Sequence, residues 1–429
     1  MPHDVVARFK VGCRYHLNMI SSTPPASQQA ITALIHHAYK PPAGFEAVPP
    51  AIHRASTVIF PNVAALRTRD WTHKTGYTYG LHGTPTTFLL EERIASLEGG
   101  KFCTLVPSGL AAVVLVGMAL LKSGDELLIP DNAYGPSKSF AEGELASWGV
   151  THQYYDPMHP SDLAAKLSLR TRLVWLEAPG SVTMEFPDVP ALVAVIKAHQ
   201  KEQPNATQNS HKAGIVTALD NTWGAGIAFN AFALGADISA HALTKYPSGG
   251  ADVLMGSVVT QNAELHQLIH FCHMRLGYGI GGNDAEVVLR GLNSIALRYA
   301  AQDAATRALA TWMQAQSEIA AVLHPALPDS PGHTAFKRDC TAAACLFSVV
   351  FKPQSTQAQI DRFCDSLKLF KLGFSWAGPM SLCVPYDVPS LRTTPWPHQG
   401  GLVRFSVGLE AVADLQADLA QALAVMHYS

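Results

Sequence analysis

The sequence predicts an α/β protein in which a large domain with a mostly parallel sheet precedes a smaller C-terminal α/β domain. Three observations lead to this fold class. Apolar runs of strand length alternate with segments of helical periodicity from Phe102 onwards. The pattern changes at Asn283, where a long helical stretch begins. The length of 429 residues, with 48% hydrophobic and 15% charged residues, is enough for two domains that share a large core.

The large domain is predicted to contain a sheet of short apolar strands. Because alternating strands and helices place consecutive strands parallel and cover both faces of the sheet, the carboxyl ends of these strands should share one edge. The apolar run from Leu110 to Leu121 predicts a buried helix. It is not expected to span a membrane, since it is well short of the roughly 20 residues that cross a bilayer. The predicted strands cover residues 102–106, 126–130, 150–155, 173–177, 215–219, 237–240 and 252–260.

The C-terminal part is predicted to begin with a long helical stretch over residues 283–317. A strand over 343–351, a helix over 357–367, a strand over 401–407 and a final helix over 411–426 follow. Residues 201–212, rich in Gln and Asn, should form an exposed loop inside the large domain. We find no internal repeat.

Composition and charge restrict the classes of function. The net charge of -2 and the lack of any run of five basic residues argue against a nucleic-acid or acidic membrane partner, so we expect a small-molecule substrate. The first 22 residues have no continuous apolar segment, which argues against a cleaved secretory signal. The seven cysteines form no CxxC pair. Free thiols in a reducing cytosol are therefore expected, and we predict a cytoplasmic protein.

Two residues after predicted strands suggest a covalent cofactor. Lys245 lies between strand 237–240 and a Ser-Gly-Gly loop, and Asp220 ends the strand that begins at Ile215. Pyridoxal 5'-phosphate (PLP) needs a lysine that forms a Schiff base with its aldehyde and a carboxylate that faces its ring nitrogen. Taken alone, each residue has an ordinary alternative. Lysines after strands are commonly solvated, and an Asp at a strand end is commonly a turn former or helix cap.

A third element could hold the phosphate. Gly109 opens a helix-forming run directly after strand 102–106, and helix N-termini bind anions through free N–H groups and the helix dipole. An ordinary N-cap without ligand is the alternative. In sheets of this kind ligands gather at the carboxyl ends of strands. Because Gly109, Asp220 and Lys245 all follow predicted strands, they converge on one candidate PLP site.

Several further motifs occur in a recognisable order. Because of them the chain, from about Thr32 to the C-terminus, resembles the Cys/Met-metabolism family of fold type I PLP-dependent enzymes, and within it the cystathionine β-lyases. The motifs are Arg54-Ala55-Ser56-Thr57-Val58, Tyr79-Gly80, Leu97-Glu98-Gly99-Gly100, Glu177-Ala178-Pro179-Gly180-Ser181, Thr183-Met184-Glu185, Asp220-Asn221-Thr222-Trp223, Thr244-Lys245-Tyr246, Ser375-Trp376 and Arg404 to Glu410.

The resemblance implies roles on the substrate side of the cofactor. Lys245 would hold PLP, remove the substrate α-proton and then donate a proton to the leaving thiolate. Tyr134 would stack on the cofactor ring and assist proton movement. Arg404 would clamp the substrate α-carboxylate with a bidentate fork, in a pocket also lined by Ser375 and Trp376.

The resemblance also implies the cofactor contacts. Asp220 would keep the pyridine nitrogen protonated through a charge-assisted hydrogen bond. The backbone N–H groups of Gly109 and Leu110, with the Thr244 hydroxyl, would hold the phosphate. No metal is implied.

Tyr79 resembles a tyrosine that reaches the cofactor phosphate of the neighbouring subunit. The resemblance therefore implies a homo-oligomer, a tetramer built from dimers with shared active sites. The chain would divide into a flexible extension (1–30), an arm toward the neighbouring subunit (31–84), a PLP-binding domain (85–285) and a C-terminal domain (286–429). The sequence departs from the family at Leu81 and His82, because an arginine usually stands two residues after this tyrosine.

The segment from Glu177 to Ser181, followed by Thr183 to Glu185, resembles the β-lyase version of a loop in which γ-enzymes commonly have Ser-Asn-Pro. It implies cleavage of L-cystathionine to homocysteine, pyruvate and ammonia, a transsulfuration step of methionine biosynthesis. Cysteine and other S-substituted cysteines remain possible substrates. A γ-lyase or γ-synthase, a cysteine desulfhydrase and a non-catalytic binder with this fold are the alternatives.

His266, His270 and His273 recur at i, i+4 and i+7, so they would share one face of a helix over residues 264–276. That spacing can bind zinc. No carboxylate joins these histidines on that face, and the family needs no metal. We therefore expect a polar or subunit-facing stripe and no metal site.

Overall fold

A computed structural model describes residues 32, 43–44, 47–71, 73–74, 76–202 and 214–426. The predicted extension over residues 1–30 and nearly all of the predicted loop over 201–212 lie outside these residues. Within the described ranges no helix is both long and apolar enough to cross a membrane.

The large sheet has seven strands in the order β1-β7-β6-β5-β4-β2-β3. Strand β7 pairs antiparallel with both of its neighbours, β1 and β6, and all other strand pairs of this sheet are parallel. The predicted mostly parallel sheet is confirmed. The strands are β1 (Phe102–Val106), β2 (Glu126–Pro130), β3 (Thr151–Tyr155), β4 (Thr171–Glu177), β5 (Val216–Asp220), β6 (Ile238–His241) and β7 (Gly256–Thr260).

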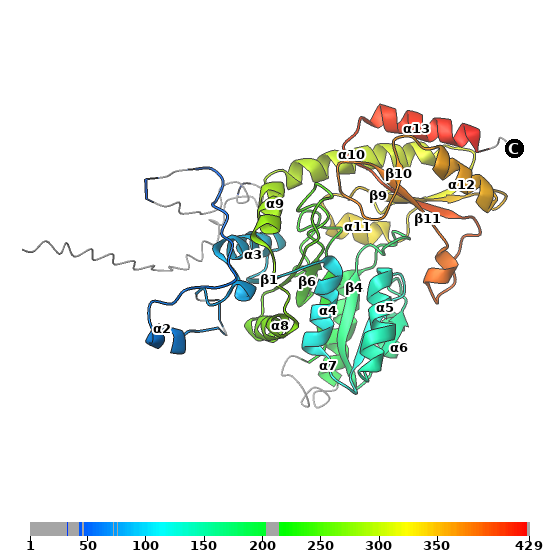
Figure 1. Ribbon diagram of the computed structural model, residues 1–429. Helices are drawn as coiled ribbons and strands as arrows, with labels where there is room; N and C mark the ends of the chain where they lie inside the picture. The colour runs from blue at the N-terminus through cyan, green and yellow to red at the C-terminus, as the bar shows by residue number, and fades with distance from the viewer. Residues whose placement is uncertain are drawn as a thin grey trace, which may run out of the picture.

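Helices cover both faces of this sheet (Figure 1). One face packs on α4 (Gly109–Leu120), α5 (Gly135–Phe140) with its π-helical continuation (Ala141–Leu145), and α8 (Ala263–Leu276). The other face packs on α3 (Pro85–Glu98), α6 (Pro160–Lys166) and α7 (Val189–Glu202). The apolar run predicted to be buried forms α4, in which Leu115 and Val116 are fully inaccessible to solvent.

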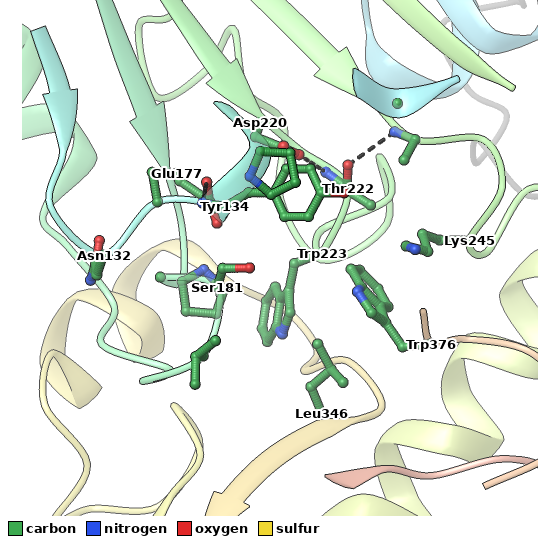
Figure 2. Close-up of a pocket in the computed structure, with 18 of the residues that line it drawn as sticks. Asn132, Tyr134, Glu177, Ser181, Asp220, Thr222, Trp223, Lys245, Leu346 and Trp376 are labelled. Carbon is green, nitrogen blue, oxygen red and sulfur yellow. Dashed lines mark hydrogen bonds between the residues drawn. The ribbon is translucent and has the colours of Figure 1, made fainter. Parts of the chain in front are cut away.

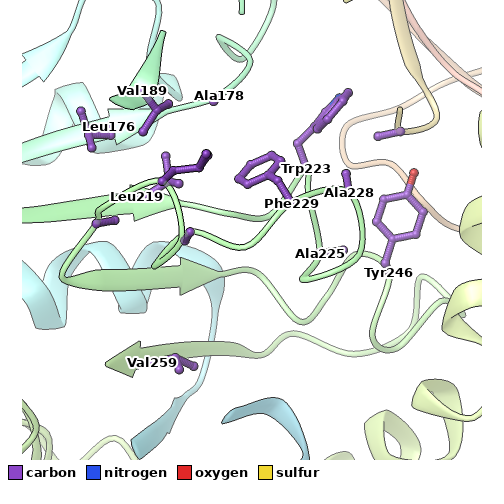
Figure 3. Packing of buried hydrophobic residues seen from close by; sticks show 14 of the residues in the cluster. Leu176, Ala178, Val189, Leu219, Trp223, Ala225, Ala228, Phe229, Tyr246 and Val259 are labelled. Atoms are coloured by element: carbon purple, nitrogen blue, oxygen red, sulfur yellow. The ribbon is translucent and has the colours of Figure 1, made fainter. Parts of the chain in front are cut away.

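The loops after β5 and β6 enclose part of the core. Trp223 and Phe229 stack at 6.5 Å between ring centroids, and both pack edge-on against Phe186. Figure 3 shows Trp223 and Phe229 in the same buried cluster as Tyr246, the residue that follows Lys245. The buried Tyr246 hydroxyl accepts the N–H of Cys345 at 2.8 Å, which ties the lysine loop to the C-terminal part of the chain. This packing fixes the loop that follows Asp220 and the loop that carries Lys245.

The C-terminal sheet has the order β10-β11-β12-β9-β8, with α12 (Gln357–Ser366) and α13 (Val412–Val425) packed together beside it. Helix α11 (His333–Asp339) and two single 3-10 turns, η1 (Gly80–His82) and η3 (Val388–Leu391), complete the connections. The strands are β8 (Ile319–Leu323), β9 (Leu346–Phe351), β10 (Lys371–Leu372), β11 (Leu382–Tyr386) and β12 (Leu402–Ser406).

The long helix predicted over residues 283–317 is two helices, α9 (Gly282–Leu292) and α10 (Ile295–Gln314). The break falls at Asn293, whose side-chain oxygen accepts a hydrogen bond from Arg93 at 3.0 Å. This tertiary contact lies at the break between the two helices, which periodicity does not show. Residues 252–255 of the predicted strand 252–260 are a loop, since Ala251 has a φ of 59° and turns the chain before β7 begins.

The arm before α3 is the most exposed part of the described chain. In Figure 1 it projects, in blue and with α2 (Val63–Arg67), away from the body of the molecule. Val48 is fully exposed, and Ile59 and Val63 are 85% and 58% exposed. Apolar side chains gathered on one projecting segment are typical of a surface that another chain covers.

Candidate active site

A cavity of about 510 Å³ opens where the carboxyl ends of β4, β5 and β6 face the C-terminal sheet. The structure brings nearly all of the predicted site residues to this cavity and leaves Tyr79 outside it. The predicted residues that line it are Gly109, Leu110, Tyr134, Asp220, Thr244, Lys245, Ser375, Trp376 and Arg404.

Lys245 reaches the cavity from the loop after β6 (Figure 2). Its ammonium Nζ donates to Ser375 Oγ at 2.7 Å and lies 5.5 Å from the centroid of the Trp376 ring. Burial and the nearby Arg404 guanidinium lower the pKa of Lys245 to about 8. A substantial fraction of this amine is therefore neutral near physiological pH, as a nucleophile or a general base requires.

Asp220 ends β5 at the floor of the cavity. Its carboxylate accepts the N–H of Thr222 at 2.9 Å, and the Thr222 hydroxyl accepts the N–H of Ala242 at 3.0 Å, as the dashed lines in Figure 2 show. Burial raises the pKa of Asp220, while the contacts to Thr222 and the charges of His241 and Lys245 oppose that rise. The bonds to Thr222 thus fix the carboxylate relative to the lysine loop.

The N-terminus of α4 forms the other end of the cavity. Ser108 caps the helix by accepting the N–H of Ala111 at 3.0 Å, and Gly109 and Leu110 occupy the first turn, where N–H groups have no partner within the helix. A Cβ on Gly109 would lie 2.5 Å from the Cβ of Ala242, so glycine permits this close approach of helix and loop. The arrangement fits a bound phosphate.

Thr244 already uses its hydroxyl. The hydroxyl accepts the N–H of Met255 at 3.1 Å and donates to the carbonyl oxygen of Met255 at 3.3 Å. The Thr244 hydroxyl, to which the family resemblance gives a phosphate contact, thus also holds the lysine loop against the segment before β7. The phosphate contact stays a prediction.

Arg404 enters the cavity from β12 and is buried. Its guanidinium donates to the carbonyl oxygen of Ser181 at 3.3 Å and lies 5.2 Å from the centroid of the Tyr386 ring. Among the described residues no carboxylate forms an ion pair with it. Burial lowers the pKa of Arg404. A buried guanidinium without an anion favours the entry of one, and a substrate carboxylate has the matching geometry.

The segment that carries Ser375 and Trp376 has an unusual backbone. Ser375 and Ala377 have φ values of 86° and 62°, in the region that L-residues rarely adopt. Such conformations are held by their surroundings and cluster at functional sites. Here the conformation accompanies the bond from Lys245 to Ser375 and the edge-on packing of Trp376 on Tyr246 at 5.9 Å.

Sequence reasoning assigned no role to several other ionisable residues at the cavity, among them Glu177, His241 and Arg392. Glu177 ends β4 beside Asp220 in the register of the sheet. His241 contacts Glu98 at 2.7 Å, with both side chains fully buried. Arg392 is paired with Glu185 at 3.2 Å. Two of the three, Glu177 and His241, occupy strand ends, and the signal that identified Asp220 could have found them.

The departure from the family pattern lies on the arm. Tyr79 is 47% exposed, and Leu81 and His82 follow it in the turn η1. His82 Nδ1 lies 2.7 Å from the Thr78 hydroxyl, and burial lowers the pKa of His82. None of these residues lines the cavity of its own chain.

His266, His270 and His273 form a stacked row on α8, with ring centroids 5.9 Å and 6.5 Å apart. Burial lowers the pKa of His266 and His270 to about 3 and that of His273 to about 4. The row contacts Phe102 of β1, which stacks on His266 at 4.8 Å. In the part of the chain that the structure describes, no group of three or more His, Cys, Asp or Glu side chains is arranged to hold a metal ion.

The chemistry of the cavity fits PLP bound to an amino-acid substrate. Asp220 can face a ring nitrogen, Lys245 can reach an aldehyde, and the first turn of α4 can receive a phosphate. Arg404, which none of these three cofactor contacts uses, can bind the carboxylate of the substrate. The aromatic Tyr134, 41% exposed at the cavity, offers a ring face to a planar ligand.

Comparisons with known proteins agree with this chemistry. Residues 31–424 match the family model described as Cys/Met metabolism PLP-dependent enzyme. A putative cystathionine β-lyase of Rhizobium johnstonii is 39% identical over 88% of this chain and 91% of its own. The cystathionine β-lyase of Escherichia coli is 35% identical, with 87% and 92% of the two chains covered.

The crystal structure of a cystathionine γ-synthase from Xanthomonas oryzae superposes with a TM-score of 0.81 at 28% identity, over 93% of this chain and 98% of the other. The shared fold is that of the fold type I PLP-dependent enzymes, as the sequence predicted. The match of the family model to most of the chain, and relatives above 30% identity along most of their length, show that the chain belongs to the Cys/Met metabolism family of PLP-dependent enzymes.

Proposed function

We propose that this protein is a carbon–sulfur β-lyase that cleaves L-cystathionine to homocysteine, pyruvate and ammonia. The observation that carries the proposal is the buried Arg404, which has no carboxylate partner among the described residues and opens into the same cavity as Lys245. An α-carboxylate bound there would bring the substrate amino group and Cα toward the lysine. The similarity to cystathionine β-lyases supports the choice of substrate.

Each residue of the site would have its own role in this reaction. Arg404 binds and orients the α-carboxylate, with Ser375 and Trp376 beside it. Lys245, with its pKa lowered to about 8, removes the proton from Cα and later gives a proton to the departing sulfur. Asp220 would hold a proton on the ring nitrogen of PLP, and Tyr134 would stack on the ring. When bound, PLP supplies the electron sink that makes the Cα proton removable.

β-Elimination is favoured over γ-chemistry by the loop from Glu177 to Ser181, which resembles the β-lyase version. A γ-reaction needs a second deprotonation at Cβ, whereas a β-elimination needs loss of the Cα proton and a thiolate leaving group. Cysteine and other S-substituted cysteines offer the same Cα proton and Cβ–S bond, so we include them as substrates. A γ-lyase or γ-synthase is the second candidate, since a γ-synthase shares the fold.

Product analysis distinguishes these reactions. The PLP-loaded protein is incubated with L-cystathionine, and both products are identified by mass spectrometry. Pyruvate with homocysteine is the expected result, because the Cβ–S bond on the cysteine side breaks. 2-Oxobutyrate with cysteine would assign the chain to the γ-lyases and contradict the proposal.

We also propose a homotetramer of dimers with shared active sites, working in cytoplasmic methionine biosynthesis. Residues 31–84 would be the arm toward the neighbouring subunit, 85–285 the PLP-binding domain and 286–429 the C-terminal domain. The exposed apolar side chains of the arm and the position of Tyr79 outside its own cavity support the arm's role. Tyr79 would then reach the phosphate in the neighbouring site, with His82 or another donor in place of the usual arginine.

Mixing two inactive variants tests the shared site. Lys245→Ala and Tyr79→Ala should each have little activity, and a mixture refolded or exchanged together should regain part of it. In a mixed dimer one cavity receives an intact Lys245 and an intact Tyr79 from different chains. The recovery is measured as pyruvate formation, with native mass spectrometry confirming mixed oligomers. Mixed oligomers that show no recovery would rule out a contribution of Tyr79 to the neighbouring site.

A further inference from the structure

A second carboxyl group shares the cavity floor with Asp220. Glu177 and Asp220 are the last residues of the adjacent parallel strands β4 and β5, and they pair in the register of the sheet. Paired residues of neighbouring strands point to the same face, on strands about 4.8 Å apart. Both residues line the cavity, as Figure 2 also shows. Two acidic groups therefore face one buried space.

Glu177 also holds Tyr134 in place. Its Oε2 accepts the backbone N–H of Tyr134 at 2.9 Å, at the start of α5. This bond connects the strand next to Asp220 with the residue whose ring faces the cavity. Moving or removing the Glu177 side chain would leave the Tyr134 N–H without its acceptor and free the ring to shift.

No basic side chain among the described residues forms an ion pair with Glu177. The charged group facing it from β5 is Asp220. A further ionisable group near it is the buried Tyr155 of β3, which donates its hydroxyl to the Trp175 carbonyl oxygen at 2.7 Å. Burial and the negative charge of Asp220 raise the pKa of Glu177 well above its usual range. Asp220 is better placed to stay ionised, because Thr222, His241 and Lys245 oppose the effect of burial on its pKa.

We propose that Glu177 is a positioning residue that stays protonated, so that Asp220 is the single ionised carboxylate at the cavity floor while Glu177 fixes Tyr134 over the cofactor ring. Two ionised carboxylates this close in a buried site repel each other, and one of them retains its proton. The neutral acid still accepts the Tyr134 N–H through its carbonyl oxygen. The proposal uses the assignment of Asp220 and Tyr134 to PLP but does not depend on which carbon–sulfur bond is cleaved.

The protonation state can be measured directly. Difference infrared spectroscopy of the wild-type holoenzyme minus Glu177→Gln at neutral pH should show the carbonyl stretch of a protonated carboxylic acid. The matched control is Glu126→Gln. Glu126 is also buried, but it accepts bonds from Gln153, Ser168 and Thr171 at the opposite end of the sheet, and those bonds lower its pKa. The control difference should show an ionised carboxylate. A carboxylate band for Glu177 would overturn the proposal.

The positioning of Tyr134 has its own readout in the dissociation constant of PLP. Glu177→Ala should weaken PLP binding about tenfold (about 1.4 kcal/mol), since the Tyr134 ring is no longer held in place to stack on the cofactor ring. Glu177→Gln, which is neutral and keeps the acceptor, should bind PLP within about threefold of wild type. Equal affinities for the alanine and glutamine variants would overturn the positioning role. If the alanine variant does not fold, the glutamine variant alone decides. Binding of PLP by that variant tenfold more weakly than by wild type would overturn the positioning role. Neither readout depends on turnover, so a failure of the lyase assignment is seen separately in product analysis.

Discussion

Replacing Lys245 with alanine is expected to lower β-elimination by about 10⁴-fold or more. The variant loses the amine that binds the cofactor covalently and also loses the general base, and the base alone contributes roughly 10²- to 10⁴-fold. Among the described residues that line the cavity, Lys245 is the only lysine, and the other basic side chains there, His241, Arg392 and Arg404, carry no primary amine. Turnover is measured as pyruvate formation from L-cystathionine.

Two further variants test whether turnover needs the Schiff base that Lys245 forms or only a positive charge at this position. Lys245→Arg keeps a cation near Ser375 but cannot form a Schiff base, so it should be as inactive as the alanine variant. Lys122→Ala removes an exposed lysine at the end of α4 and should leave turnover unchanged. The absorbance of the bound cofactor should change in both Lys245 variants. A Lys245→Ala variant with more than a tenth of wild-type turnover would exclude Lys245 as the cofactor lysine.

The sequence predicts the parts of this site that depend on local pattern. Asp220 and Lys245 follow short apolar strands, and Gly109 opens an apolar helix, so each has a position that periodicity identifies. The topology of a parallel sheet then brings the ends of its strands to one edge. Arg404 lies on the second sheet, and only the resemblance to a family assigned it to the same cavity.

Features that depend on contacts between distant segments were not predictable. The break between α9 and α10 lies at Asn293, which accepts a hydrogen bond from Arg93, 200 residues earlier in the chain. The strand β10 has two residues and exists through its pairing with β11. The positive φ of Ser375 is held by its surroundings, and the proton proposed for Glu177 depends on a carboxylate in the next strand. Local propensity contains none of this information.

Changing Asp220 to asparagine is expected to lower turnover roughly 10²- to 10⁴-fold. Asparagine has nearly the same shape and still accepts the Thr222 N–H, so the loop should keep its place. The variant loses the negative charge of Asp220, which would hold a proton on the nitrogen of the cofactor ring. Removing one member of a buried charged pair costs about 3–5 kcal/mol, and that energy converts to the stated range of rates.

The matched control for this variant is Asp237→Asn at the start of β6, next to β5 but at the opposite end of the sheet from the cavity. The Asp237 carboxylate accepts the N–H and the hydroxyl of Thr217, both at 2.8 Å, and asparagine retains an acceptor for them. The control should keep the cofactor absorbance and turnover of wild type, although its stability can differ. If Asp220→Asn keeps more than a third of wild-type turnover, the ring nitrogen needs no ionised partner in this site. Protonation of Glu177 would then have no electronic consequence for Asp220, and its role would reduce to holding Tyr134.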